Sequence, residues 1–203
     1  MSYRSSSTSR IPPVEECLHV MDRCGMMSNI RRHSLIVARI AAAVGRALNR
    51  KGSNLDIHLI VAGALLHDIA KTRSLREGGD HVEMGRRLVS ELGYPAVAWI
   101  VGGHVDSGPE IASLINEATL VNYADKRVQH DKVVSLQRRF EDLEARYGGS
   151  PRKKSRIREM AKNMEKLENR IFSQLALSPD GLGLMVGDVP TNALSEDWIF
   201  EDQ

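Results

Sequence analysis

The stretch Ala64–Lys71, ALLHDIAK, places His67 and Asp68 at the end of an almost purely apolar run. The residues before His67, LIVAGALL at 59–66, carry no polar side chain. A carboxylate in such surroundings is costly to bury unless it is paired or bound to a metal. The stretch therefore predicts a buried helix that ends in a polar pair with partners elsewhere in the chain.

Composition limits the class of protein. The chain has 203 residues, of which 42% are hydrophobic and 27% charged, as in ordinary globular domains, and its net charge is only +2. No apolar run approaches the roughly 20 residues that a transmembrane helix needs. Residues 1–12 lack the apolar core of a secretory signal, and we expect a flexible lead there. Cys17 and Cys24 are expected to be reduced thiols of a cytoplasmic protein.

Hydrophobic periodicity is helical nearly throughout, without strand alternation or internal repeats, and predicts an all-α fold. Pro and Gly mark several helix ends, and Ser53 and Asn54 are candidate caps of the apolar helix. The expected helices lie within residues 12–25, 28–50, 53–72, 80–93, 95–104, 109–129, 132–149 and 150–177.

We divide the chain into the lead, one domain at 13–148, a basic helix at 149–178 and a tail at 179–203. Residues 151–170 hold 8 basic and 3 acidic side chains, which we interpret as a solvated helix face, with binding to RNA, phosphates or anionic lipid as the alternative. Apolar residues near the end, Trp198, Ile199 and Phe200, are expected to dock on the same domain or on a neighbouring subunit.

Polar side chains occur at several positions where the pattern calls for apolar ones. His33 shares a helix face with Val37, Ile40 and Val44. A single inward histidine is more often a hydrogen-bonded core residue than a ligand. Several such residues in one small α-domain are better explained together, by a metal site built from different helices. The candidates are His33, His67, Asp68, His81, His104 and Asp125.

These residues resemble the H…HD…D signature of the HD-domain metal-dependent phosphohydrolases. The spacing is 34 positions from His33 to His67 and 57 from Asp68 to Asp125, and the resemblance covers roughly residues 28–130. It implies an all-α HD-domain helical bundle, here with an extra C-terminal helix. It further implies one divalent metal held by His33, His67, Asp68 and Asp125, and a second held by His81 and His104 with Asp68 bridging. The metals could be Fe, Mn, Zn, Co or Ni.

The implied activity is hydrolysis of a nucleotide-type phosphomonoester, phosphodiester or phosphoanhydride by a metal-bound hydroxide. Asp68 would anchor the metals and orient the hydroxide. Lys71 lies four residues after His67, hence on the same helix face, where it would act in catalysis and bind a phosphate oxygen. Lys126 and Arg127, next to Asp125, are further candidate phosphate contacts.

Two other functions stay open. An HD-type diiron oxygenase would use a nearly identical ligand set to activate O₂, and a non-catalytic nucleotide-sensing module would keep only the fold. The expected partner is a small phosphorylated substrate, neither a membrane nor a nucleic acid, and assembly into a homo-oligomer is left open.

Overall fold

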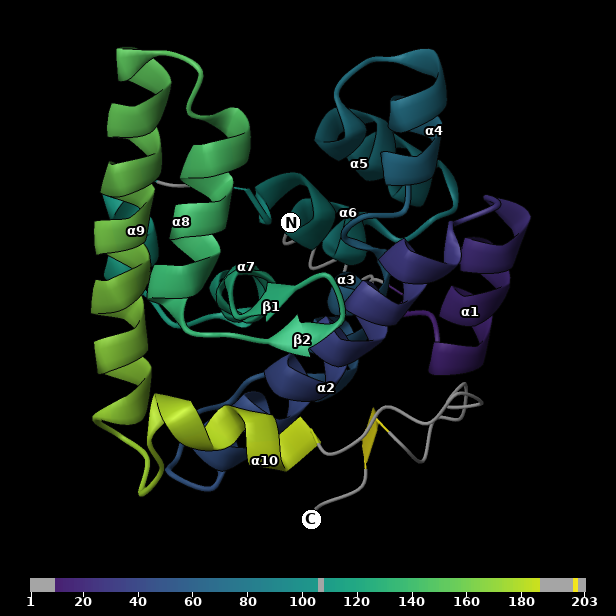
Figure 1. The fold of residues 1–203 in the computed structure, drawn as a ribbon. Helices are drawn as coiled ribbons and strands as arrows, with labels where there is room; N and C mark the ends of the chain where they lie inside the picture. Colours follow the sequence, from purple (N-terminus) through teal and green to yellow (C-terminus); the bar gives the residue numbers. More distant parts are fainter. Residues whose placement is uncertain (1–9, 106–107, 187–198, 201–203) are drawn as a thin grey trace, which may run out of the picture.

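The computed structural model describes residues 10–105, 108–186 and 199–200, and their architecture is all-α, as predicted (Figure 1). Helix α2, Ser28–Asn49, runs through the centre and is buried along most of its length. Helices α3, at Ile57–Leu66, and α7, at Glu117–Lys126, pack against it and against each other, and α6, at Pro95–Gly103, packs against α3 and α7. Among the described residues, none of the helices combines the length and the apolar composition that a membrane-spanning helix requires.

Helix α3 is buried on nearly all sides, as its sequence predicted, and it approaches α6 unusually closely. Gly63 makes this approach possible, because a Cβ there would lie 2.6 Å from Cγ2 of Ile100 on α6. That separation is well inside the normal carbon–carbon contact of about 3.5–4.0 Å. On the other side, α1, Val14–Arg23, packs on α3 through its buried face.

The start and the end of α3 differ from the expectation for residues 53–72. The N-cap is Asp56, whose side chain accepts a hydrogen bond from the Leu59 amide, and neither Ser53 nor Asn54 caps the helix. The helix ends at Leu66, and residues 67–70 form turns before α4 begins at Lys71. The polar pair His67–Asp68 therefore lies just beyond a helix end.

Two short helices cover one side of this core. They are α4, Lys71–Glu77, and α5, His81–Glu91, whose N-cap Asp80 accepts a hydrogen bond from the Val82 amide. Helix α5 packs on α6, and α4 and α5 form the upper right part of the molecule in Figure 1, above α6. This arrangement brings the first residue of α5, His81, next to the end of α6.

The prediction of a single helix at 109–129 is wrong. A 3₁₀ helix at Pro109–Ala112 is followed by a break, and α7 starts anew because Asn116 and Thr119 form a reciprocal capping box. Beyond α7 lies a small antiparallel ribbon, β1 at Val128–Gln129 and β2 at Lys132–Val133, which the helical pattern missed. His130 adopts a left-handed backbone, φ 57°, in its turn.

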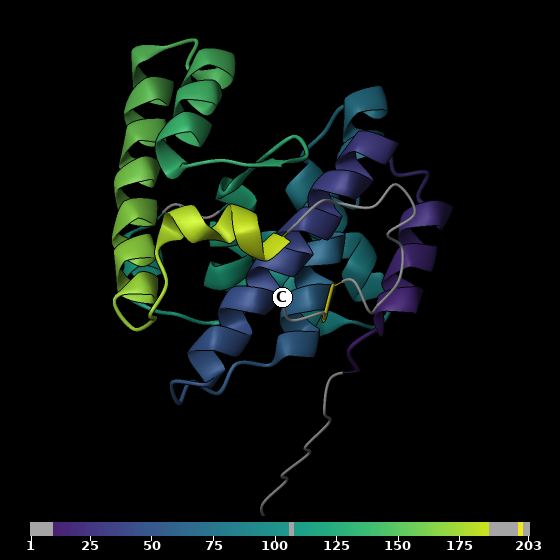
Figure 2. The ribbon, with the colours of Figure 1, turned by 60° about the horizontal axis from the view of Figure 1, so that its bottom comes forward.

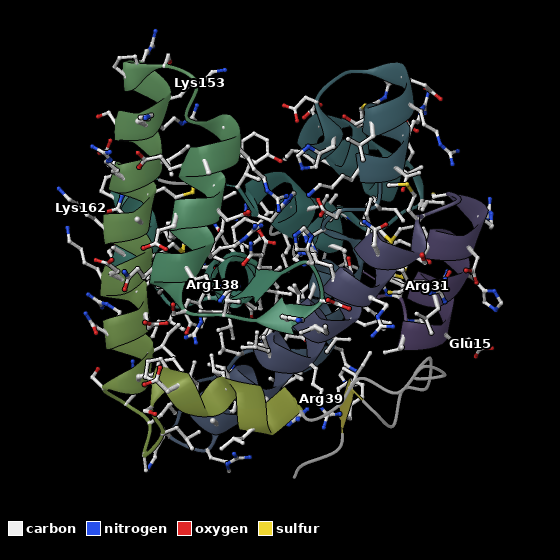
Figure 3. All side chains as sticks on the ribbon, viewed as in Figure 1. Glu15, Arg31, Arg39, Arg138, Lys153 and Lys162 are labelled. Atoms are coloured by element: carbon white, nitrogen blue, oxygen red, sulfur yellow. The ribbon has the colours of Figure 1, made fainter. Side chains whose placement is uncertain are left out.

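Helices α8, Leu136–Tyr147, and α9, Pro151–Phe172, run side by side along one edge of the molecule (Figure 1). The buried residues of α9 include Met164, Leu167 and Ile171. Its many basic side chains are exposed, and Lys153 and Lys162 project outward in Figure 3. The exposed charges agree with the interpretation of a solvated face.

The C-terminal part returns to the core. After a 3₁₀ turn at Pro179–Gly181, α10, Leu182–Val186, lies against α2 (Figure 2). Ile199 is buried, and the ring of Phe200 lies 5.8 Å from that of His58 at the start of α3. The tail thus docks on its own domain at these two residues. Trp198 and the predicted flexible residues 1–9 lie outside the described residues.

Candidate metal centre

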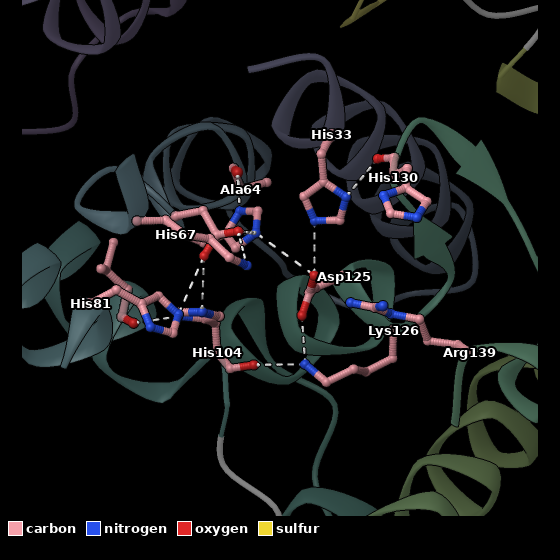
Figure 4. Close-up of polar contacts among 12 residues, drawn as sticks. His33, Ala64, His67, His81, His104, Asp125, Lys126, His130 and Arg139 are labelled. Carbon is pink, nitrogen blue, oxygen red and sulfur yellow. Dashed lines mark hydrogen bonds and ion pairs between the residues drawn. The ribbon is translucent and has the colours of Figure 1, made fainter. Parts of the chain in front are cut away.

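Three helices end at one place inside the core. His67 is the C-cap of α3, His104 is the C-cap of α6, and Asp125 lies in the last turn of α7. A helix C-terminus carries partial negative charge from its unsatisfied carbonyl groups, which favours cations. His33 from α2 and His81 from α5 complete the group around Asp68 (Figure 4). The fold therefore gathers all six predicted ligands where a cation is favoured.

Backbone carbonyl groups orient three of the histidine rings. Nδ1–H of His67 donates to the Ala64 carbonyl at 2.7 Å, and Nδ1–H of His104 donates to the Val101 carbonyl at 2.7 Å. His33 makes the same kind of bond, 3.0 Å long, to the carbonyl of His130. With Nδ1 used in this way, each Nε2 points into the cluster, as is usual for metal-binding histidines (Figure 4).

A first group of ligand atoms surrounds one oxygen of Asp68. Nε2 of His67 lies 3.6 Å from Asp68 Oδ2 and 3.8 Å from Asp125 Oδ1. Nε2 of His33 lies 2.9 Å from the same Asp125 oxygen. One ligand atom each of His33, His67 and Asp68 fits within 4.8 Å, so this group has the size of a metal site.

A second group surrounds the other oxygen of Asp68. Nε2 of His81 lies 3.4 Å from Asp68 Oδ1, and Nε2 of His104 lies 3.8 Å from it. These three residues again offer ligand atoms within 4.8 Å of one another. Asp68 is thus common to both groups and faces each with a different oxygen, which is the arrangement of a bridging carboxylate.

The donor set fits divalent metals by two independent observations. His67 Nε2 and Asp68 Oδ1 are buried and have no hydrogen-bond partner in the structure, although such atoms are normally satisfied. In addition, two ligands bonded to one metal at about 2.1 Å are about 3.0–3.4 Å apart. The separations of 3.4–3.8 Å between the histidine nitrogens and the oxygens of Asp68 are close to that range.

The ionisation of the cluster also suits a metal. Burial lowers the pKa of His67 and His81, and it lowers that of His104 to about 3, so these rings are neutral at pH 7. Burial by itself would raise the pKa of Asp68, but His67 and Lys71 outweigh it and hold the pKa well below its usual range. The pKa of Asp125 is lowered in the same way, against burial, chiefly by Lys126. Neutral imidazole and ionised carboxylate are the metal-binding forms.

Two of the three predicted phosphate-binding cations lie at the cluster. Lys71 Nζ is 2.8 Å from Asp68 Oδ2, and Lys126 Nζ is 2.5 Å from Asp125 Oδ2 and 3.3 Å from the His104 carbonyl. Lys71 reaches the cluster from the start of α4, not along the face of α3 as predicted, since α3 ends before it.

Arg127 points elsewhere. Its guanidinium donates to Glu168 of α9 at 2.6 Å, to the Tyr123 hydroxyl at 2.8 Å, and to the carbonyls of Val134 and Pro179. These contacts fix α9 and the C-terminal segment on α7. Arg127 is thus part of the packing between helices, and Lys71 and Lys126 are the predicted cations that remain at the site.

His130 is a site residue that sequence reasoning missed. It contributes its carbonyl group to His33, and its left-handed backbone in the β1–β2 turn presents that carbonyl. The segment QHDK at 129–132 has the polar composition of a tight turn, and this composition could have predicted the turn between the two strands. Nothing in the sequence indicated that this turn contacts His33, which is 97 positions away.

Residues 30–128 match the model of the HD domain family. This match, with the H…HD…D residues gathered at one centre, shows that the chain belongs to the HD-domain superfamily. Proteins of this superfamily are generally metal-dependent hydrolases, and the domain implies binding of a divalent metal.

Three curated proteins are similar to the chain over part of its length. A tRNA (cytidine(56)-2'-O)-methyltransferase of Thermoplasma volcanium is 28% identical over 67% of this chain and 42% of its own. An uncharacterized protein of Methanocaldococcus jannaschii is 27% identical over 59% of this chain and 78% of its own. Ribonuclease Y of Aquifex aeolicus is 32% identical over 60% of this chain and 22% of its own. The chain thus spans less than half of the methyltransferase and of the ribonuclease. No solved structure matches the chain significantly.

Proposed function

We propose that the protein is a metal-dependent phosphohydrolase that cleaves a nucleotide-type phosphomonoester, phosphodiester or phosphoanhydride. The observation that carries this proposal is the pair of unsatisfied buried atoms, His67 Nε2 and Asp68 Oδ1, within a cluster that Asp68 divides into two ligand groups. A cluster with two such groups suits two metal ions better than one.

The roles follow from the two groups. His33, His67, Asp68 and Asp125 would hold one ion, and His81, His104 and Asp68 the other. When bound, such ions lower the pKa of a coordinated water and neutralise phosphoryl oxygens. Asp68 would hold the ions at a fixed separation, since its two oxygens face different groups.

The charge at the site supports a phosphate substrate. The carboxylates of Asp68 and Asp125 are each already paired with an ammonium group, from Lys71 and Lys126. Divalent ions added to these balanced pairs would leave the site with net positive charge, which attracts a phosphate. Lys71 is the more accessible of the two cations, with 37% of its side chain exposed, and would bind a phosphate oxygen as a point charge.

The relatives support a substrate that is a nucleotide or is built from nucleotides. The names of two of them, a tRNA methyltransferase and Ribonuclease Y, state that these proteins act on RNA. This chain spans only part of each, so the inference concerns only the segment of each relative that matches it. Nucleotides and the ends of RNA strands are therefore the first compounds to screen.

The test is metal analysis of the purified protein, followed by a phosphate-release screen across nucleotides and short RNAs with manganese, iron or cobalt. Asp68→Asn should lose metal and activity together. Asp56→Asn is the matched control, because it makes the same change at the N-cap of α3, where Asn caps equally well.

Other outcomes would support other functions. Activity of Asp68→Asn after complete loss of metal would contradict the proposed roles. Oxygen consumption without phosphate release would indicate the diiron oxygenase. A sensing module would be indicated if the wild-type protein binds nucleotides without hydrolysing them and His67→Ala binds them equally well.

A further inference from the structure

Helix α8 carries a second polar cluster, which the proposed roles do not use. Asp142 accepts a hydrogen bond from Arg139 Nη1 at 3.1 Å, and its other oxygen pairs with Arg146 Nε at 2.8 Å. The three residues are three and four positions apart and so share one face of the helix. One carboxylate between two guanidinium groups leaves this cluster with net positive charge.

This face of α8 is connected to the metal-ligand cluster. Arg146 Nη2 lies 2.9 Å from Nε2 of His130, and the carbonyl of His130 accepts the hydrogen bond of His33 Nδ1–H. In Figure 4, the guanidinium of Arg139 points from α8 toward Asp125 and Lys126. Arg139 therefore points toward the first ligand group.

Arg139 is held in place but not fully satisfied. Only 13% of its side chain is exposed, and its Nε is buried without a hydrogen-bond partner in the structure. A buried donor left unpaired normally costs stability, and native proteins contain few. Arg139 needs no further carboxylate to be anchored, since Asp142 already binds Nη1. The Nε–H thus has no acceptor among the described residues.

We propose that Arg139 binds a phosphate group of the substrate and that α8 forms the phosphate-binding wall of the site. A guanidinium presents its Nε–H and Nη–H donors in a planar fork that matches two phosphate oxygens. The inference rests on the proposed function for the identity of the ligand, and it adds a residue that the HD signature does not contain. Asp142 fixes the direction of the fork through Nη1 and leaves Nε free.

The experiment measures binding of inorganic phosphate to the full-length, manganese-loaded protein by calorimetry and by the phosphate-dependent rise of Tm. Arg139→Met removes the fork and keeps much of the side-chain volume, and we expect at least about a tenfold loss of phosphate affinity with the metal content unchanged. Arg138→Met is the matched control, because it removes the same charge from an exposed position next to it and should change the affinity less than about twofold.

A purely structural role for Arg139 predicts a different result. Arg139→Met also removes the hydrogen bond to Asp142, so Tm in the absence of phosphate is expected to fall under either role. A purely structural role leaves the rise of Tm on adding phosphate unchanged, whereas a phosphate-binding role abolishes that rise. An unchanged phosphate affinity in a folded, metal-loaded Arg139→Met would overturn the proposal.

If Arg139→Met does not fold, Arg139→Lys provides a second test of the proposal. Lysine retains the charge without the fork, and we expect a loss of phosphate affinity smaller than that predicted for methionine but still measurable. Wild-type affinity in Arg139→Lys would contradict the proposal. Because these measurements report binding alone, they can succeed even if no phosphate ester is hydrolysed, so failure of the proposed function is recognised separately.

Discussion

Replacing Gly63 by alanine should test whether the close approach of α3 to α6 shapes the metal centre. The new Cβ would lie 2.6 Å from Cγ2, 2.9 Å from Cδ1 and 3.1 Å from Cβ of Ile100. Because the Cβ of Ile100 is itself too close, a change of rotamer cannot remove the clash, and the two helices must separate. Overpacking of this kind costs up to about 3 kcal/mol. Alanine regains about 1 kcal/mol through its helix propensity.

The net loss is therefore about 2 kcal/mol, which corresponds to a fall in Tm of about 4–8 °C for a chain of this size. Asp68 follows α3 and His104 follows α6, and their ligand atoms are already 3.8 Å apart. Separation of the helices should weaken the metal held by His81 and His104 first. Urea unfolding and metal titration of the same preparations measure the two effects.

Two companion variants make the result interpretable. Gly183→Ala in α10 meets no atom within 4 Å and should leave stability unchanged or raise it by up to about 1 kcal/mol. Ile100→Ala opens a cavity, part of which the methyl group introduced by Gly63→Ala would occupy, so the double variant should be no less stable than Ile100→Ala alone. A Gly63→Ala protein as stable as the parent, with unchanged metal affinity, would refute the reasoning.

Three further predictions concern the ligands, the packing of α9 and the effect of pH. His81→Ala should lower the metal content from about two ions per chain to about one, and an unchanged content measured by elemental analysis would exclude a second ion at His81. Arg127→Met should cost about 1–3 kcal/mol in urea unfolding, since it removes the cation that pairs with Glu168, whose side chain is only 18% exposed, while the metal content stays the same. The pKa of His104 is lowered by burial from 6.5 to about 3. Between pH 7 and pH 5, His104 therefore becomes protonated in the unfolded chain but not in the folded chain. The unfolding free energy of the metal-free protein should fall by about 2 kcal/mol over this range. A flat profile in chelator-treated protein would contradict the neutral state of this ring.

The helical class and the position of most helices could be predicted because they depend on local patterns. The apolar faces of α1, α2 and α9 repeat at the helical period, and Pro or Gly stands near their ends. The prediction failed where a local cap interrupted an apolar pattern, as at Asn116. It also failed at the β1–β2 ribbon, whose two-residue strands are too short to show alternation.

The amino-acid pattern was enough to predict which residues supply the site and that His67, Asp68, His81 and His104 lie near helix ends. The predicted ligands are His33, His67, Asp68, His81, His104 and Asp125, and the structure brings these six residues together. These ligands could be predicted because histidine and aspartate are conspicuous in an apolar pattern and are costly to bury without partners.

How these residues are grouped, and which cations accompany them, depends on three-dimensional packing that the local pattern does not show. Each oxygen of Asp68 faces a different ligand group, because α3, α5 and α6 meet at the turn that contains Asp68. Lys126 and Arg127 are neighbours in sequence, yet one reaches Asp125 and the other Glu168. Adjacent residues of a helix point about 100° apart, so which of them meets a site depends on what packs on each face. That packing comes from distant parts of the chain, and it also turns Arg139 toward the ligands (Figure 4).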